Sequence, residues 1–73
     1  MNKREACYKL AEINEKIYEI ENMLSNIESR LIWDDESKKP WYLERKEQLT
    51  SQLSKCLQEH DDFINEYKDI LYS

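Results

Sequence analysis

Apolar residues recur along the first half of the chain at alternating steps of four and three. The series has no skipped position and runs Ala6, Leu10, Ile13, Ile17, Ile20, Leu24, Ile27, Leu31. This is the heptad spacing of a helix that packs along one seam, whereas a strand would need strict alternation. The pattern predicts a helix from about residue 3 to residue 32.

The second half carries a wider apolar face. One seam comprises Leu49, Leu53, Cys56, His60, Phe63, Tyr67 and Ile70, and a second beside it comprises Leu53, Leu57, His60, Ile64, Tyr67 and Leu71. Two adjacent seams indicate two helical neighbours rather than one. We predict a second helix from about residue 40 to residue 71, with Pro40 near its start and Asp35 or Ser37 as its N-cap.

The connection between the two helices, about residues 33 to 39, is so short that they can only fold back antiparallel. The expected fold is therefore all-α: a single domain over residues 1–73, built as a coiled-coil-like helical hairpin. With equal rise on both arms, residues whose numbers sum to about 73 should face each other. The expected pairs are Leu24 with Leu49, Ile20 with Leu53, Ile17 with Cys56, Ile13 with His60, and Leu10 with Phe63.

A two-helix hairpin buries one seam and leaves the other exposed. The exposed strip of Leu57, Ile64 and Leu71, extended by Leu43, would be larger than monomers usually leave in solvent. The simplest cover is a second copy, which gives an antiparallel four-helix bundle as a homodimer, although a different helical protein would serve equally well. The predicted self-association residues are Leu43, Leu53, Leu57, His60, Ile64, Tyr67 and Leu71.

Charge placement also favours the hairpin. Lys3, Arg4 and Lys9 begin the first helix, and Asp61, Asp62, Glu66 and Asp69 end the second. Each set opposes the dipole of its own helix, but antiparallel folding would bring the two sets together. We therefore expect ion pairs between the helices at this end, each contributing ~0.2 to 1 kcal/mol.

Composition narrows the class of protein. The 73 residues include no glycine and carry a formal charge of −5, so binding to phosphate backbones is not expected. The opening sixteen residues contain no apolar run of the kind that forms a secretory signal or a membrane span. A cytoplasmic protein with no membrane association is expected.

No residue constellation points to catalysis, so we expect no enzyme, cofactor or metal site. His60 has neither a second histidine nor a suitably spaced carboxylate, and it is more simply a seam residue. The acidic run at the turn lacks the glycine and the spaced ligands of a calcium loop. Cys7 and Cys56 have no Cys-x-x-Cys spacing. Lys46 falls at a seam position opposite Ile27, where it snorkels or fixes the register of association.

The turn region, LIWDDESKKPWYLERK over residues 31–46, places aromatic residues on both sides of a polar stretch. The favoured account is a plug in which Leu31, Trp33, Trp41 and Tyr42 close the open end of the bundle. The alternative is a recognition surface, because tryptophan, tyrosine and arginine dominate binding hot spots. The predicted partner-binding residues are Trp33, Trp41, Tyr42 and Arg45.

These features favour a non-catalytic protein–protein interaction module, for example a phage or mobile-element inhibitor or an adaptor. With one long helix, a polar turn and a second apolar-faced helix, the chain also resembles in layout the small co-chaperones of type III secretion needle subunits. A second class is an acidic nucleic-acid mimic, suggested by Glu59, Asp61, Asp62, Glu66 and Asp69 near one end. Direct nucleic-acid binding through Lys38, Lys39, Arg45 and Lys46 ranks last, because acidic residues are interspersed with them.

Overall fold

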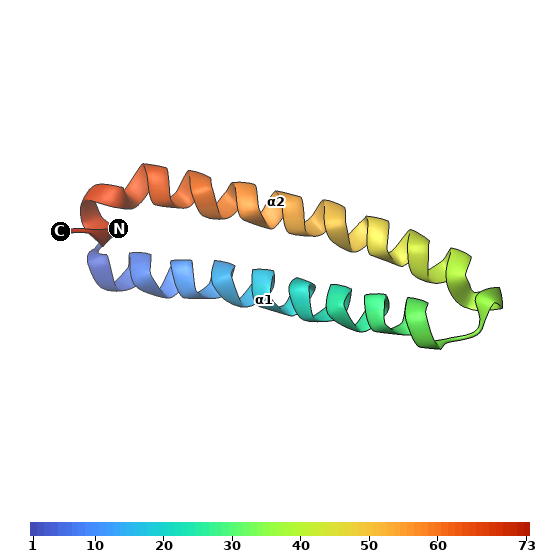
Figure 1. The fold of residues 1–73 in the computed structure, drawn as a ribbon. Coiled ribbons are helices and arrows are strands. Elements are labelled where there is room, and N and C mark those ends of the chain that lie inside the picture. The colour runs from blue at the N-terminus through green and yellow to red at the C-terminus, as the bar shows by residue number, and fades with distance from the viewer.

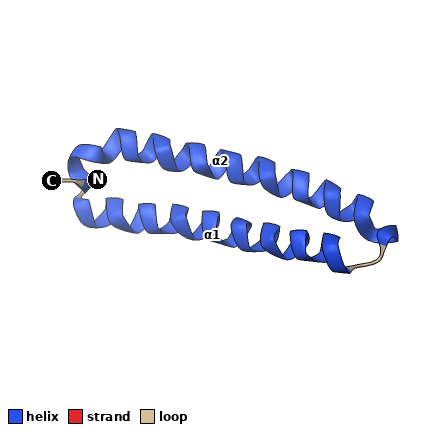
Figure 2. Ribbon diagram, in the orientation of Figure 1, coloured by secondary structure: helices blue, strands red, loops and turns tan.

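The computed structural model describes residues 1–73 as two long α-helices joined by a short turn (Figure 1). Helix α1 spans Lys3–Trp33, the 3₁₀ turn η1 spans Glu36–Lys38, and helix α2 spans Lys39–Leu71. Helices account for almost the whole chain, and there is no strand (Figure 2). The predicted all-α class is confirmed, and each helix extends one residue further toward the turn than predicted.

The helices run antiparallel side by side, with both termini at one end and the turn at the other (Figure 1). The molecule measures 52 × 15 × 13 Å and has a radius of gyration of 16.3 Å. A compact domain of this length would have a radius of gyration of about 11 Å. The chain is therefore a thin rod, which buries little of its own surface.

The first helix begins with a side-chain cap. The side-chain oxygen of Asn2, Oδ1, accepts a hydrogen bond from the backbone N–H of Glu5 at 2.8 Å, and the side-chain Nδ2 of Asn2 donates to the Glu5 carboxylate at 3.1 Å. This reciprocal pair resembles a capping box and satisfies a backbone N–H that the helix leaves free.

The second helix begins differently from the prediction. Its N-cap position is Lys38, and no side chain caps it, so the predicted cap from Asp35 or Ser37 is wrong. The reason is that η1 leads directly into α2, with Lys39 N–H bonded to Glu36 C=O, so the chain enters the helix already coiled. Pro40 lies in the first turn, as predicted, where a missing N–H costs nothing.

Two clusters of buried residues form the seam between the helices. The cluster near the turn contains Ile20, Ile27, Tyr42 and Leu49, flanked by Leu24, Leu31, Leu53 and Cys56. The cluster near the termini contains Ala6, Ile13 and Phe63, flanked by Leu10, Ile17, Tyr67, Ile70 and Leu71. Leu24 thus shares a cluster with Leu49, and Leu10 with Phe63, as the predicted register requires. His60, predicted opposite Ile13, belongs to neither cluster.

Helix α2 bends near its end. Tyr67 has non-helical backbone angles (φ −112°, ψ 15°), and its ring lies 4.8 Å from that of Phe63 between centroids. Beyond this bend the chain curves back toward the start of α1 (Figure 1), where Lys3 Nζ donates to the Ser73 backbone oxygen at 2.7 Å. Leu71 therefore packs beside the terminal cluster rather than on an exposed strip.

Ion pairs between the helices are fewer than predicted. Lys9 pairs with Glu12 of its own helix, and the Arg4 guanidinium lies over the Tyr8 ring. The expected cross-helix pairs at the terminal end are absent, because partners one turn away on the same helix require less ordering of long side chains. The one ion pair between α1 and α2 is Lys46 with Glu28 at 3.6 Å, within one residue of the predicted register.

Candidate interaction surface

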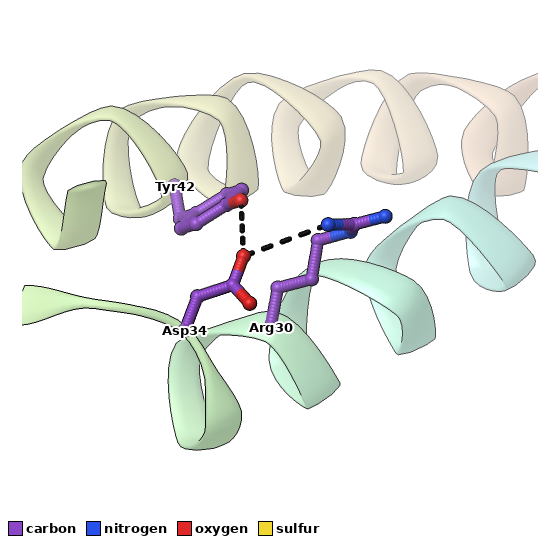
Figure 3. A network of polar contacts seen from close by, with 3 residues as sticks. All are labelled: Arg30, Asp34 and Tyr42. Carbon is purple, nitrogen blue, oxygen red and sulfur yellow. Dashed lines mark hydrogen bonds and ion pairs between the residues drawn. The ribbon is translucent and has the colours of Figure 1, made fainter.

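A buried tyrosine joins the two helices just inside the turn. Tyr42 is 6% exposed, and its hydroxyl donates to Asp34 Oδ2 at 2.6 Å (Figure 3). The same carboxylate oxygen lies 3.5 Å from Arg30 Nη1. Asp34 directly follows α1, and Tyr42 lies in the first turn of α2. The three side chains therefore tie the end of one helix to the start of the other.

The electrostatics of this contact are consistent with its geometry. The hydrogen bond from Tyr42 lowers the pKa of Asp34, and the Arg30 guanidinium also lowers it. The hydrogen bond to Asp34, together with burial, raises the pKa of Tyr42. Near neutral pH, a neutral phenol thus donates to a charged carboxylate, which is the stronger, charge-assisted form of hydrogen bond.

The tryptophans lie outside this contact. Trp33 is 82% exposed and Trp41 is 62% exposed, while the neighbouring Ile32 is 73% exposed. Trp41 meets Tyr42 edge to face, with centroids 5.1 Å apart. We call Ile32, Trp33 and Trp41 the aromatic tip.

The predicted plug is therefore wrong for both tryptophans. Tyr42, with the half-buried Leu31, closes the end of the hairpin. The reason is helical phase: Tyr42 lies seven residues before Leu49, so it continues the buried row of α2, whereas Trp41 points about 100° away. The sequence reading began that row at Leu49 and missed this continuation.

The predicted partner-binding residues thus divide into three groups. Trp33 and Trp41 are on the surface, and Tyr42 is inside and committed to Asp34. Arg45 is half-buried beside them, and its guanidinium donates to Gln48 at 3.4 Å. Ile32 was not predicted, although it directly follows the last seam residue and precedes Trp33.

The predicted self-association residues also differ in exposure. Leu43 and Leu57 are 55% and 45% exposed, and Ile64 and His60 are half-buried outside both core clusters. Leu53, Tyr67 and Leu71 are half-buried against the clusters. The His60 imidazole lies 3.5 Å from the carboxylate of the adjacent Asp61.

Helix α1 carries a row of half-buried apolar residues beside its buried row. The sequence pattern had placed both rows in the seam between the two helices. The members of the half-buried row each follow a buried residue by four positions: Leu10, Ile17, Leu24 and Leu31. Positions four residues after a buried contact fall on the same side in both helices of an antiparallel pair. Leu53 follows Leu49 in the same way, so the rows adjoin.

The adjoining rows of the two helices form one face of the hairpin, which we call the apolar side. It comprises Leu10, Ile17, Leu24 and Leu31 of α1 with Leu43, Leu53, Leu57, His60 and Ile64 of α2. The opposite side, here called the polar side, carries charged and amide side chains around a few apolar ones. There, a shallow groove of about 390 Å³ is lined by Lys16, Glu19, Ile20, Met23, Gln52, Lys55 and Cys56. The two sides therefore differ in the number of charged side chains, with Lys16, Glu19 and Lys55 lining the groove of the polar side.

Other kinds of site have little support in the structure. No group of three or more histidine, cysteine or acidic side chains is placed to hold a metal ion, and Cys7 and Cys56 are free thiols. Neither helix contains an apolar stretch long enough to cross a bilayer. Comparison of the chain with protein families, curated proteins and solved structures finds no match.

Proposed function

We propose that this chain is a non-catalytic protein–protein interaction module, such as an inhibitor or an adaptor. In this proposal the aromatic tip binds another protein, while the apolar side joins two copies into a four-helix bundle. The observation that carries the proposal is the exposure of Trp33 and Trp41 at the end of a rod whose closure does not require them.

The energetics of binding favour this use of the tip. A tryptophan left mostly in solvent contributes little to folding, but it buries a large area when a partner covers it. Tryptophan is also enriched among residues whose loss weakens complexes most. Because Trp41 and Trp33 flank the contact between Asp34 and Tyr42, their backbones are held in place before a partner arrives, which lowers the entropy cost of binding.

Affinity capture with matched variants tests the tip. The bait carrying Trp33→Ala and Trp41→Ala should keep the helical circular dichroism of the wild type and lose the captured partner. A bait carrying Tyr18→Ala serves as the control, because Tyr18 is 69% exposed in the middle of α1, away from the turn. Capture that is unchanged by the double substitution, or equally reduced by Tyr18→Ala, would contradict the assignment of the tip.

One observation supports nucleic-acid mimicry as a second candidate. The acidic residues near the end of α2 are all exposed, and no lysine or arginine lies within ion-pair distance of them: Glu59, Asp61, Asp62, Glu66 and Asp69. An acidic surface that replaces a phosphate backbone would bind through charge, and salt would weaken that binding steeply. Partner binding that persists at high salt excludes mimicry and leaves the aromatic tip as the binding surface.

A further inference from the structure

The hairpin exposes more surface to solvent than a compact monomer of the same mass does. The accessible area is 5748 Å² for 9.0 kDa. A compact monomer of this mass exposes about 4,850 Å². The surplus of about 900 Å² is close to the ~800 Å² that each partner buries in a standard stable interface. One further partner of ordinary interface size would therefore remove the excess.

The apolar side suits a second copy placed with its turn at the same end. A copy related by a two-fold axis along the rod lays its α2 against this α1, and residues at the same height meet. The ion pair of Glu28 with Lys46 fixes those heights within one hairpin. Residues whose numbers sum to 74, as those of Glu28 and Lys46 do, therefore share a height. Four such pairs between copies, spaced by seven residues, are Leu31 with Leu43, Leu24 with Thr50, Ile17 with Leu57, and Leu10 with Ile64.

Charge also favours this arrangement. Between residues 19 and 37, α1 and the start of the turn carry six acidic residues and one basic residue. Between residues 38 and 55, the remainder of the turn and the first half of α2 carry five basic and two acidic residues. Laying α2 of one copy against α1 of the other, turn beside turn, brings these opposite charges together.

The reverse, head-to-tail arrangement fits less well. It lays α2 against α2 of the copy, and full overlap of these 33-residue helices places residue 55 at the centre. Lys46 then lies at the level of an apolar residue, Ile64, of the copy. Glu47 approaches Asp61 of the copy, so two carboxylates lie near each other along the flank.

We infer that two copies pair along their apolar sides with both turns at the same end, α1 of each against α2 of the other. The inference rests on the self-association proposed above and specifies its geometry. The pairing covers Leu57 and Ile64 with Ile17 and Leu10 of the other copy. It also brings the two aromatic tips side by side, so that one end of the bundle presents four tryptophans to a partner.

Solution mass tests the surface. Light scattering should give twice the 9.0 kDa chain mass for the wild type. Leu57→Lys should weaken the dimer by about 100-fold or more, because a two-fold interface loses two leucines. Met23→Lys is the matched control: Met23 is 43% exposed on the polar side, against 45% for Leu57 on the apolar side. A monomeric wild type, or equal weakening by the two lysines, overturns the inference and leaves the proposed function of the tip intact.

A distance measurement tests the arrangement without depending on the fold of the Leu57→Lys variant. A spin label is attached to Ser37→Cys in a chain that also carries Cys7→Ser and Cys56→Ala. The expected separation between labels in the dimer is about 10 to 25 Å, the width of two packed helices with the label arms. A separation close to the 52 Å length of the rod would show head-to-tail pairing and overturn the inference.

Discussion

The two ends of the rod each bury one aromatic ring but differ in what surrounds it. At the terminal end, the half-buried Tyr67 packs at a tilt against the buried Phe63, while Tyr8, Tyr72 and the acidic side chains of α2 lie outside. At the turn end, the contact of Tyr42 with Asp34 lies inside, and Trp33 and Trp41 lie outside. The comparison shows that residue type alone does not decide burial, because both tryptophans, the largest aromatic side chains in the chain, are more than half exposed.

Helical phase explains the difference. Tyr42, Leu49 and Phe63 lie at multiples of seven residues from one another, so all three face α1. Trp41 lies one position away from that row and turns to solvent. The terminal end therefore buries an aromatic ring of α2, Phe63, whereas at the turn end the buried ring of Tyr42 is accompanied by two exposed tryptophans.

Removing an aromatic side chain from the terminal end should have the largest effect. Phe63→Ala deletes a buried ring from a cluster of only three buried residues, so we expect the free energy of unfolding to fall by about 3 kcal/mol. Urea denaturation followed by circular dichroism measures the change. Because the change is large relative to the stability of a short chain, cooperative unfolding should be nearly lost. A shift below about 0.5 kcal/mol, typical of surface positions, would contradict the assignment of Phe63 to the core.

The polar contact at the turn end should make stability depend on pH in two ranges. The lowered pKa of Asp34 gives a contribution that is complete above its ordinary value of 3.8 and is lost as pH falls below it. The raised pKa of Tyr42 gives a contribution that is complete below its ordinary value of 10.0 and is lost as pH rises above it. Melting temperatures across this range should therefore fall at both extremes.

Tyr42→Phe tests the source of both losses. The variant should melt several degrees below the wild type near neutral pH, lose the alkaline fall that belongs to Tyr42, and show a smaller acid fall. Tyr18→Phe is the control, because Tyr18 is exposed and its hydroxyl makes no hydrogen bond to another residue, unlike that of Tyr42. A wild-type pH profile in Tyr42→Phe would show that the contact with Asp34 does not stabilise the turn.

The ion pair between the helices should have a smaller effect. Glu28→Gln and Lys46→Gln, singly and together, form a double-mutant cycle with an expected coupling of about 0.5 kcal/mol or less, because both side chains are substantially exposed. The coupling should disappear in 1 M salt. Coupling that persists in 1 M salt would contradict the assignment of the pair to an exposed flank of the hairpin.

Removing a tryptophan from the turn end should have the smallest effect. Trp33→Ala should change the free energy of unfolding by less than about 0.5 kcal/mol, since the side chain is 82% exposed. Thermal melts of this variant beside Phe63→Ala give the direct contrast between the two ends. A loss comparable to that of Phe63→Ala would mean that Trp33 packs in solution and would remove it from the aromatic tip.

The sequence by itself determined the two helices, their antiparallel pairing and the register of the seam. Apolar spacing is a local property that each helix carries along its length, and a short connection leaves only one way to bring two such rows together. The same spacing identified Leu43, Leu57 and Ile64 as residues outside the buried row. The positions of Trp33 and Trp41 on either side of the short connection placed both of them at the turn.

Only the tertiary structure decided which side chains meet. Asp34 accepts from Tyr42, Lys9 takes a partner on its own helix, and the bend at Tyr67 turns Leu71 inward. Each outcome is a competition between several partners within reach, and differences of a few ångströms in position select among them. Periodicity gives the direction in which a side chain points from its helix. Which partner that side chain contacts depends on where the neighbouring helix lies.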